Sequence, residues 1–297
     1  MSVQPNTPKP AIKKIDIDAV LRERLGSRYR FVPRPLVALL KRVVCQDSLN
    51  DLLDKTGHLR DAEFCHAVLR ELGITYGVVH PERLPAPADR RVIFVSNHPL
   101  GGLDGMVLID LLTSLYGPGL KFVVNDLLMA IDQLKGVFLP VNKLGKQSRD
   151  ASDNLTRALE GPDPLVIFPA GLVSRRGADG AVADLEWHKM FINKAIASRR
   201  DIVPLFFSGR NSNFFYNFAY MRRRMGLKLN VEMALLPAEV FKQRSRNFTI
   251  VAGPRVPWNT LSTGSRAAAD AREIKDRVYS LENETERDSL RTNNDSQ

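Results

Sequence analysis

The sequence predicts an α/β protein with a mixed, mostly parallel sheet flanked by helices and preceded by an N-terminal helical hairpin. Two observations support this fold class. Short apolar runs alternate with stretches of helical periodicity after about residue 90, which is the pattern of a sheet covered on both faces. The composition, 44% hydrophobic and 26% charged over 297 residues, is that of a folded protein with a sizeable core.

The region 13–80 is expected to be helical and is a candidate for membrane association. Over residues 35–53, apolar side chains recur at helical spacing, while Lys41 and Arg42 lie off the apolar stripe, which predicts a basic amphipathic helix. A second helical stretch over 61–73 ends at a glycine, a common C-terminal cap. The sequence allows two roles for these helices, packing on the core or contact with anionic lipid.

Composition also sets the expected domain boundaries. The ends, 1–12 and 283–297, are polar and have few apolar residues to bury, so both are expected to be disordered. A proline-containing stretch over 81–87 predicts a linker. The main domain is therefore expected over 81–282.

Within the main domain, strand candidates are short apolar runs bounded by turn residues, and helical candidates separate them. In such sheets ligands bind beyond the carboxyl ends of the strands, so the chemistry is expected there. The strand candidates are residues 92–95, 121–124, 136–141, 164–169, 202–207, 230–236 and 248–253, and the helical candidates are residues 104–116, 126–134, 149–160, 187–198 and 212–225.

The net charge alone does not decide which kind of partner the protein binds. The net charge of +10 and the pI near 9.7 predict a positive surface, which attracts nucleic acid, anionic lipid or phosphorylated small molecules. The first 44 residues contain ten basic and three acidic side chains. Residues 214–224 join aromatic residues to three arginines, which suits a membrane headgroup region and equally a helix with one core face and a basic end.

Several classes of protein are excluded. Cys45 and Cys65 lack Cys-x-x-Cys spacing, which leaves no disulfide framework and no zinc knuckle. The first residues contain no apolar signal region, and no window approaches the roughly 18 consecutive apolar residues of a spanning helix. His188 lies near Asp184 and Glu186, but a capping or exposed role is expected for it rather than a metal site, and no metal is expected.

The most informative segment is residues 92–105, VIFVSNHPLGGLDG, because His98 follows directly on an apolar strand. A lone histidine is more often structural than catalytic. Here Gly101 and Gly102 allow the backbone to double back through positive φ, which would bring the Asp104 carboxylate to the imidazole. A carboxylate at one ring nitrogen leaves the other as a general base near neutral pH.

Residues 97–105, Asn-His-Pro-Leu-Gly-Gly-Leu-Asp-Gly, resemble the signature of the glycerophosphate acyltransferase-like family of lysophospholipid acyltransferases, in its hemolysin-type branch with N-H-P-x-G-G-x-D-G. The wider family has four residues between His and Asp, whereas five separate them here. The resemblance extends over about residues 75–255. Later blocks of the family resemble residues 136–143, 168–176 and 202–205, in that order.

The resemblance implies that His98 is the catalytic base and Asp104 its orienting partner, with the backbone of Gly101 and Gly102 stabilising the oxyanion. In the third block, Ala170 stands where the family has a glutamate. The acceptor is therefore left open between 1-acylglycerol-3-phosphate and a lyso-aminolipid such as a lyso-ornithine or lyso-glycine lipid. The residues expected to bind substrate are Asn97, Phe138, Asn142, Lys143, Gly171, Ser174, Arg175 and Arg176.

The function implied is that of an O-acyltransferase that moves a fatty acyl group from acyl-CoA or acyl-carrier protein to a lysolipid hydroxyl in membrane lipid synthesis. No cofactor is expected. The expected location is cytoplasmic, peripheral on the inner face of the cell membrane. The expected partners are the anionic membrane surface and, as the alternative donor to acyl-CoA, acyl-carrier protein. The alternatives are a non-catalytic lipid-binding relative and a basic nucleic-acid-binding protein. The last is disfavoured because the sequence has no nucleic-acid-binding motif, so no nucleic acid partner is expected.

Overall fold

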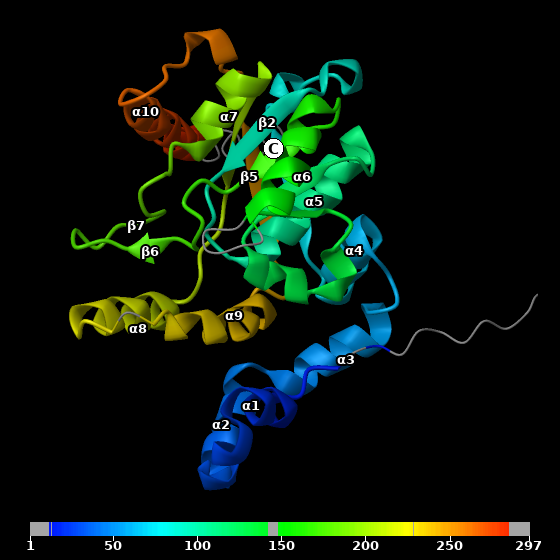
Figure 1. The fold of residues 1–297 in the computed structure, drawn as a ribbon, viewed down its shortest axis with the longest axis vertical. Coiled ribbons are helices and arrows are strands. Elements are labelled where there is room, and N and C mark those ends of the chain that lie inside the picture. The colour runs from blue at the N-terminus through cyan, green and yellow to red at the C-terminus, as the bar shows by residue number, and fades with distance from the viewer. Residues whose placement is uncertain (1–11, 13, 142–147, 228, 285–297) are drawn as a thin grey trace, which may run out of the picture.

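The protein was analysed as a computed structural model, which describes residues 12, 14–141, 148–227 and 229–284 (Figure 1). A seven-stranded sheet forms its centre, and a small two-stranded antiparallel ribbon lies outside it. The strands of the large sheet are β1 (Thr75–Val79), β2 (Val92–Ser96), β3 (Lys121–Val124), β4 (Phe138–Pro140), β5 (Leu165–Ile167), β8 (Asp201–Phe207) and β9 (Asn247–Ala252), and the ribbon consists of β6 (Arg175–Arg176) and β7 (Val182–Ala183).

The strand order in the large sheet is β1-β9-β8-β2-β5-β3-β4. Strands β8, β2, β5, β3 and β4 run parallel to one another. Strand β9 is antiparallel to β8, and β1 follows the direction of β9. The predicted mixed, mostly parallel sheet is therefore confirmed, with β2 near its middle.

Helices cover both faces of the sheet, as Figure 1 shows. A short 3-10 segment, η6 (Val231–Leu235), precedes α9. The helices are α1 (Ile17–Leu25), α2 (Arg34–Val43), α3 (Gln46–Thr56), α4 (Asp61–Glu71), α5 (Gly102–Tyr116), α6 (Ser148–Glu160), α7 (Met190–Ser198), α8 (Asn213–Arg224), α9 (Leu236–Lys242) and α10 (Ala267–Ser280).

The alternation of side chains along β2 divides the core into two layers. Phe94 faces the layer built by α4 and α5, whereas Ile93 and Val95 face the layer built by α6, α7 and α10. All of β2 is buried because it lies between β8 and β5 with helices on both sides. The carboxyl end of β2 is therefore held rigidly.

The predicted N-terminal helices are present, with α3 in contact with α4. The helix expected over 35–53 is broken into α2 and α3 at Cys45, whose φ of 52° is left-handed. Helix α4 buries Cys65 and Val68 in the same core layer as α5. Strand β1, at Thr75–Val79, lies within the predicted helical region and before the predicted domain boundary, yet it pairs with β9 in the sheet.

The strand predicted over 230–236 is wrong. This segment forms η6 and the start of α9 instead. Pro237 lies in the first turn of α9, where its missing N–H is harmless and its fixed φ suits the start of a helix. The helix predicted over 126–134 is likewise two short 3-10 turns.

None of the helices in the described part of the chain combines the length and apolarity needed to cross a membrane. The ends predicted to be disordered lie, apart from residues 12, 283 and 284, outside the described residues.

Candidate active site

The carboxyl end of β2 is fixed by a buried asparagine. The Asn97 amide Nδ2 donates to the Phe207 carbonyl at 3.0 Å, and the Phe207 N–H donates to Asn97 Oδ1 at 2.7 Å. Asn97 thus imitates a strand partner for the last residue of β8. The side chain is buried and holds the end of β8, a structural role in place of the predicted contact with substrate.

The turn after β2 depends on one glycine rather than two. Gly101 has a φ of 84°, and a Cβ there would lie 3.0 Å from Val173 Cγ2 and 3.1 Å from Leu236 Cδ1. Gly102, by contrast, is the first residue of α5 and does not have a positive φ. The predicted reversal through positive φ is therefore made by Gly101 alone.

The predicted contact between His98 and Asp104 is present despite the five intervening residues. His98 Nδ1 lies 3.1 Å from Asp104 Oδ1, although the contact is too poorly aligned to be a regular hydrogen bond. The Asp104 carboxylate is fully buried and accepts the N–H groups of Leu100 at 2.9 Å and Gly105 at 2.8 Å. It therefore closes the turn and faces the imidazole at the same time.

The imidazole of His98 is partly buried, with 16% of the side chain exposed, and stacks on Phe168 with the ring centroids 4.1 Å apart. Burial lowers the pKa of His98. The negative charges of Asp104 and Asp184 together raise it by more than burial lowers it, so the pKa lies above its ordinary value. A carboxylate beside Nδ1 favours the tautomer with hydrogen on Nδ1, which leaves Nε2 as the acceptor.

The backbone of His98 is held on both sides by a segment that sequence reasoning did not connect to it. Its N–H donates to Asp184 Oδ1 at 3.1 Å, and its carbonyl accepts the Ser174 N–H at 2.9 Å. Asp184 Oδ1 also accepts the Ser174 hydroxyl at 2.6 Å, and Oδ2 accepts the Trp187 indole N–H at 3.0 Å. We call these interactions the His98 clamp.

Asp184 is the functional candidate that the sequence did not reveal. It had drawn attention only as a neighbour of the exposed His188. It lies 86 residues from His98 in the chain, so no local spacing pattern announces the contact. Burial raises its pKa, and the donated hydrogen bonds of Ser174 and Trp187 act in the opposite direction.

This arrangement can perform general base chemistry next to a helix N-terminus. His98 offers a ring nitrogen backed by a buried carboxylate, and Gly102, at the start of α5, is exposed. The first N–H groups of a helix have no partner within the helix and favour negative charge nearby. A developing oxyanion close to His98 would find such donors there.

Comparison with known proteins identifies the family. A family model described as Acyltransferase matches residues 19–287. The chain belongs to this acyltransferase family. The predicted enzyme class and the predicted resemblance are therefore confirmed.

Two relatives are similar over nearly the whole acyltransferase. It is 40% identical over 267 residues to a lyso-glycine lipid O-acyltransferase of Bacteroides thetaiotaomicron, covering 90% of this chain and 97% of the relative. It is 39% identical over 267 residues to a lyso-glycine lipid O-acyltransferase of Phocaeicola vulgatus, covering 90% and 95%. The crystal structure of the 1-acyl-sn-glycerophosphate acyltransferase PlsC from Thermotoga maritima is 18% identical, covers 89% of this chain and 98% of that chain, and has a TM-score of 0.42.

The two arginines predicted to bind a headgroup have different surroundings in the acyltransferase. Arg175 is buried, and its guanidinium donates to Glu232 Oε1 at 3.0 Å and to the Val173 carbonyl at 2.7 Å, so it is not available to a headgroup. Arg176 is half-buried and donates to Asn213 Oδ1 at 3.0 Å. Of the two, Arg176 remains the candidate.

The remaining predicted substrate contacts fall in different places. Ser174 is buried within the His98 clamp, which corrects its predicted role. Phe138 begins β4 and packs, half-buried, against the core. Gly171 makes an exposed turn with a φ of 64°. Asn142 and Lys143 lie outside the described residues.

Among the residues described, no group of three or more His, Cys, Asp or Glu side chains is arranged to hold a metal.

The clamp predicts a large stability effect at Asp184. Asp184→Ala leaves the N–H of His98, the Ser174 hydroxyl and the Trp187 indole buried without their acceptor, so we expect the free energy of unfolding to fall by about 3 kcal/mol or more. Urea denaturation measures this. The exposed neighbour Glu186 supplies the control, since Glu186→Ala should change stability by only about 0.5 kcal/mol. Equal midpoints for the two variants would contradict the clamp.

Proposed function

We propose that this acyltransferase transfers a fatty acyl group from acyl-CoA or acyl-carrier protein to the hydroxyl of a lyso-glycine lipid. The observation that carries the reaction is the close approach of His98 Nδ1 to the buried Asp104 carboxylate. The acceptor rests on the two relatives at 40% and 39% identity, both of which are lyso-glycine lipid O-acyltransferases. The replacement of the family's glutamate by Ala170 is consistent with an acceptor other than a glycerophosphate.

In the proposed mechanism, Nε2 of His98 removes the proton of the acceptor hydroxyl as its oxygen attacks the thioester carbonyl. Asp104 holds the ring and stabilises the imidazolium that forms. The N–H groups at Gly101 and Gly102 stabilise the tetrahedral oxyanion. Collapse of this intermediate breaks the carbon–sulfur bond, and the imidazolium returns its proton to the leaving thiolate. No acyl-enzyme forms.

We assign the acceptor's anionic headgroup to Arg176, with Gly171 and Phe138 as further proposed contacts. Arginine binds carboxylate and phosphate groups bidentately. Arg176 lies two residues after Ser174, whose N–H bonds to the carbonyl of His98. The proposed headgroup contact therefore lies on the same segment that holds the backbone of His98.

The enzyme is proposed to act in the cytoplasm as a peripheral protein on the inner face of the cell membrane. Support comes from the acceptor, which is a membrane lipid, and from the basic excess of the first 44 residues. The exposed Leu36 and Leu39 of α2 provide apolar contacts beside Arg34 and Arg42.

The acceptor can be tested directly. Acyl transfer from labelled acyl-CoA and acyl-carrier protein is measured on lyso-glycine lipid, lyso-ornithine lipid and 1-acylglycerol-3-phosphate. We expect the highest kcat/KM with lyso-glycine lipid and a fall of about 10²- to 10⁴-fold in His98→Ala, which loses the base. A preference for 1-acylglycerol-3-phosphate would reject the proposed acceptor. Equal, measurable rates for the parent and His98→Ala would reject His98 as the base. If neither protein acylates any acceptor while both bind lipid vesicles, the alternative of a non-catalytic lipid-binding protein is favoured.

The raised pKa of His98 predicts the pH dependence. The base must be neutral, so kcat/KM should rise with pH through a pKa above the ordinary value of 6.5. Asp104→Asn removes the charge that raises this pKa while burial still lowers it, so the acidic limb should move to lower pH as the maximal rate falls. Glu186→Gln, an exposed change, should leave the profile in place. An acidic limb unmoved in Asp104→Asn would separate the limb from His98.

A further inference from the structure

Helix α8 carries apolar side chains on both sides. Its inner side buries Phe215, Tyr216 and Ala219. Its outer side has exposed polar residues, among them Asn217 and Arg224. Beside them, four large apolar side chains on α8 and just beyond it are also exposed, at i, i+4, i+7 and i+11. These are Phe214 (61% exposed), Phe218 (38%), Met221 (60%) and Met225 (64%).

The exposed apolar surface continues past the helix. Leu227 and Leu229 are 53% and 74% exposed, and Val231 and Met233 of η6 are 40% and 36% exposed. Together with the four residues of the outer side of α8, these define what we call the α8–η6 face. Scattered single apolar residues are ordinary on a protein surface, but a contiguous set of this size marks a contact site.

Within residues 202–246, the segment that carries the α8–η6 face, the exposed charges are of one sign. Residues 202–246 contain two acidic side chains, Glu232 and Glu239, and both are buried. The basic side chains in this stretch include Arg210, Arg223 and Arg224, all exposed. An apolar face that is bordered by exposed arginines and has no exposed carboxylate along this stretch complements the surface of an anionic bilayer.

The face is tied to the catalytic turn by buried ion pairs. Glu232 of η6 contacts Arg222 of α8 at 2.7 Å and Arg175 of β6 at 3.0 Å. Arg175 follows Ser174, a member of the His98 clamp. On the other side, Leu236 of α9 packs against Gly101. Whatever binds the α8–η6 face is therefore held at a fixed distance from His98.

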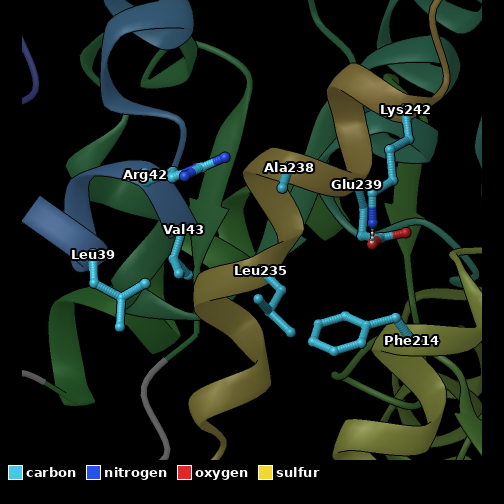
Figure 2. Close-up of a pocket in the computed structure, with 8 residues that line it drawn as sticks. All are labelled: Leu39, Arg42, Val43, Phe214, Leu235, Ala238, Glu239 and Lys242. Atoms are coloured by element: carbon cyan, nitrogen blue, oxygen red, sulfur yellow. Dashed lines mark hydrogen bonds and ion pairs between the residues drawn. The ribbon is translucent and has the colours of Figure 1, made fainter.

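The N-terminal helices lie beside this face. A cavity of about 340 Å³ opens between α2 and the α8–α9 region, with Leu39 and Val43 on one side and Phe214 and Leu235 on the other (Figure 2). Arg42 adds positive charge to its lining, whereas Lys242 is paired with Glu239 at 2.6 Å. In Figure 1, α2, α8 and α9 lie at the same end of the molecule. Phe214 is the residue of the α8–η6 face that lines this cavity, so the face borders α2 there and extends away from it.

We propose that the α8–η6 face enters the interface of an anionic membrane, as a contact separate from the N-terminal helices, and that it holds the catalytic turn at the depth of the lipid headgroups. The inference rests on the proposed action on a membrane lipid, but not on which lipid is the acceptor. The apolar side chains enter the acyl boundary, while Arg223 and Arg224 meet the headgroups.

The test measures binding without turnover. His98→Ala protein is mixed with vesicles of phosphatidylglycerol and phosphatidylcholine in equal parts, and the bound fraction is measured by co-sedimentation. Adding Met225→Glu and Leu229→Glu places charge on the two most exposed positions outside α8, and we expect the vesicle affinity to fall roughly tenfold or more. Vesicles of phosphatidylcholine alone should bind the His98→Ala parent more weakly.

The matched control carries the same charge change elsewhere. Leu115→Glu with Leu128→Glu alters two apolar residues that are 41% and 39% exposed away from the face, and should retain the parent's affinity. Thermal unfolding checks that both double variants fold. A third variant, Leu36→Glu with Leu39→Glu in α2, measures the contribution of the N-terminal helices.

The possible results distinguish a membrane from a second copy of the chain as the partner of the α8–η6 face. Unchanged vesicle binding in the Met225→Glu, Leu229→Glu protein would overturn the proposal, most directly if the α2 variant lost binding. A changed sedimentation coefficient with unchanged vesicle binding would likewise overturn it and identify a second copy of the chain as the occupant. Because no acyl transfer is measured, failure to acylate lyso-glycine lipid would leave this result intact.

Discussion

The hydrogen bond from the His98 N–H to the buried Asp184 carboxylate is the constraint on which the site depends. A carboxylate is costly to bury unless its oxygens are satisfied, and Asp184 receives three donors. Those donors come from the end of β2, from the start of β6 and from the segment before α7. The same group thus joins three parts of the chain and fixes the backbone from which the imidazole projects.

Another buried carboxylate, that of Glu232, connects the site to α8 and η6. Glu232 is enclosed between Arg175 and Arg222, and the group keeps one surplus positive charge away from water. Such a cluster is weak evidence for stability, because desolvation offsets much of the attraction, but removing one partner would leave an uncompensated charge. Its clearest consequence is geometric. Helix α8 and η6 cannot shift without disturbing the strand next to the His98 clamp.

The parts of the fold that could be predicted from sequence are those set by local pattern. The apolar run of β2, the glycine turn and the periodicity of α5 are contiguous, so His98 and Asp104 could be paired from spacing alone. Contacts between distant segments have no such signal. Asp184 was therefore missed, and Arg175 was assigned to a headgroup because its partner, Glu232, lies 57 residues further along the chain. Residues 230–236 resemble a strand because most of them are apolar, although they form η6 and the start of α9.

The net charge of +10 combines buried and exposed basic residues, which have different effects. Arg175 and Arg222 are neutralised in part by Glu232, and Arg200 is fully buried with its guanidinium bonded to backbone carbonyls, including those of Leu159 and Asp163. These arginines hold the core together and contribute little to the outer field. The field comes from exposed residues, and many of them belong to the N-terminal helices and the surroundings of α8, at one end of the molecule in Figure 1. An anionic lipid surface that contacts the acyltransferase at that end would meet basic residues of α2 and α8, close to where α9 packs against the turn that carries His98 and Asp104.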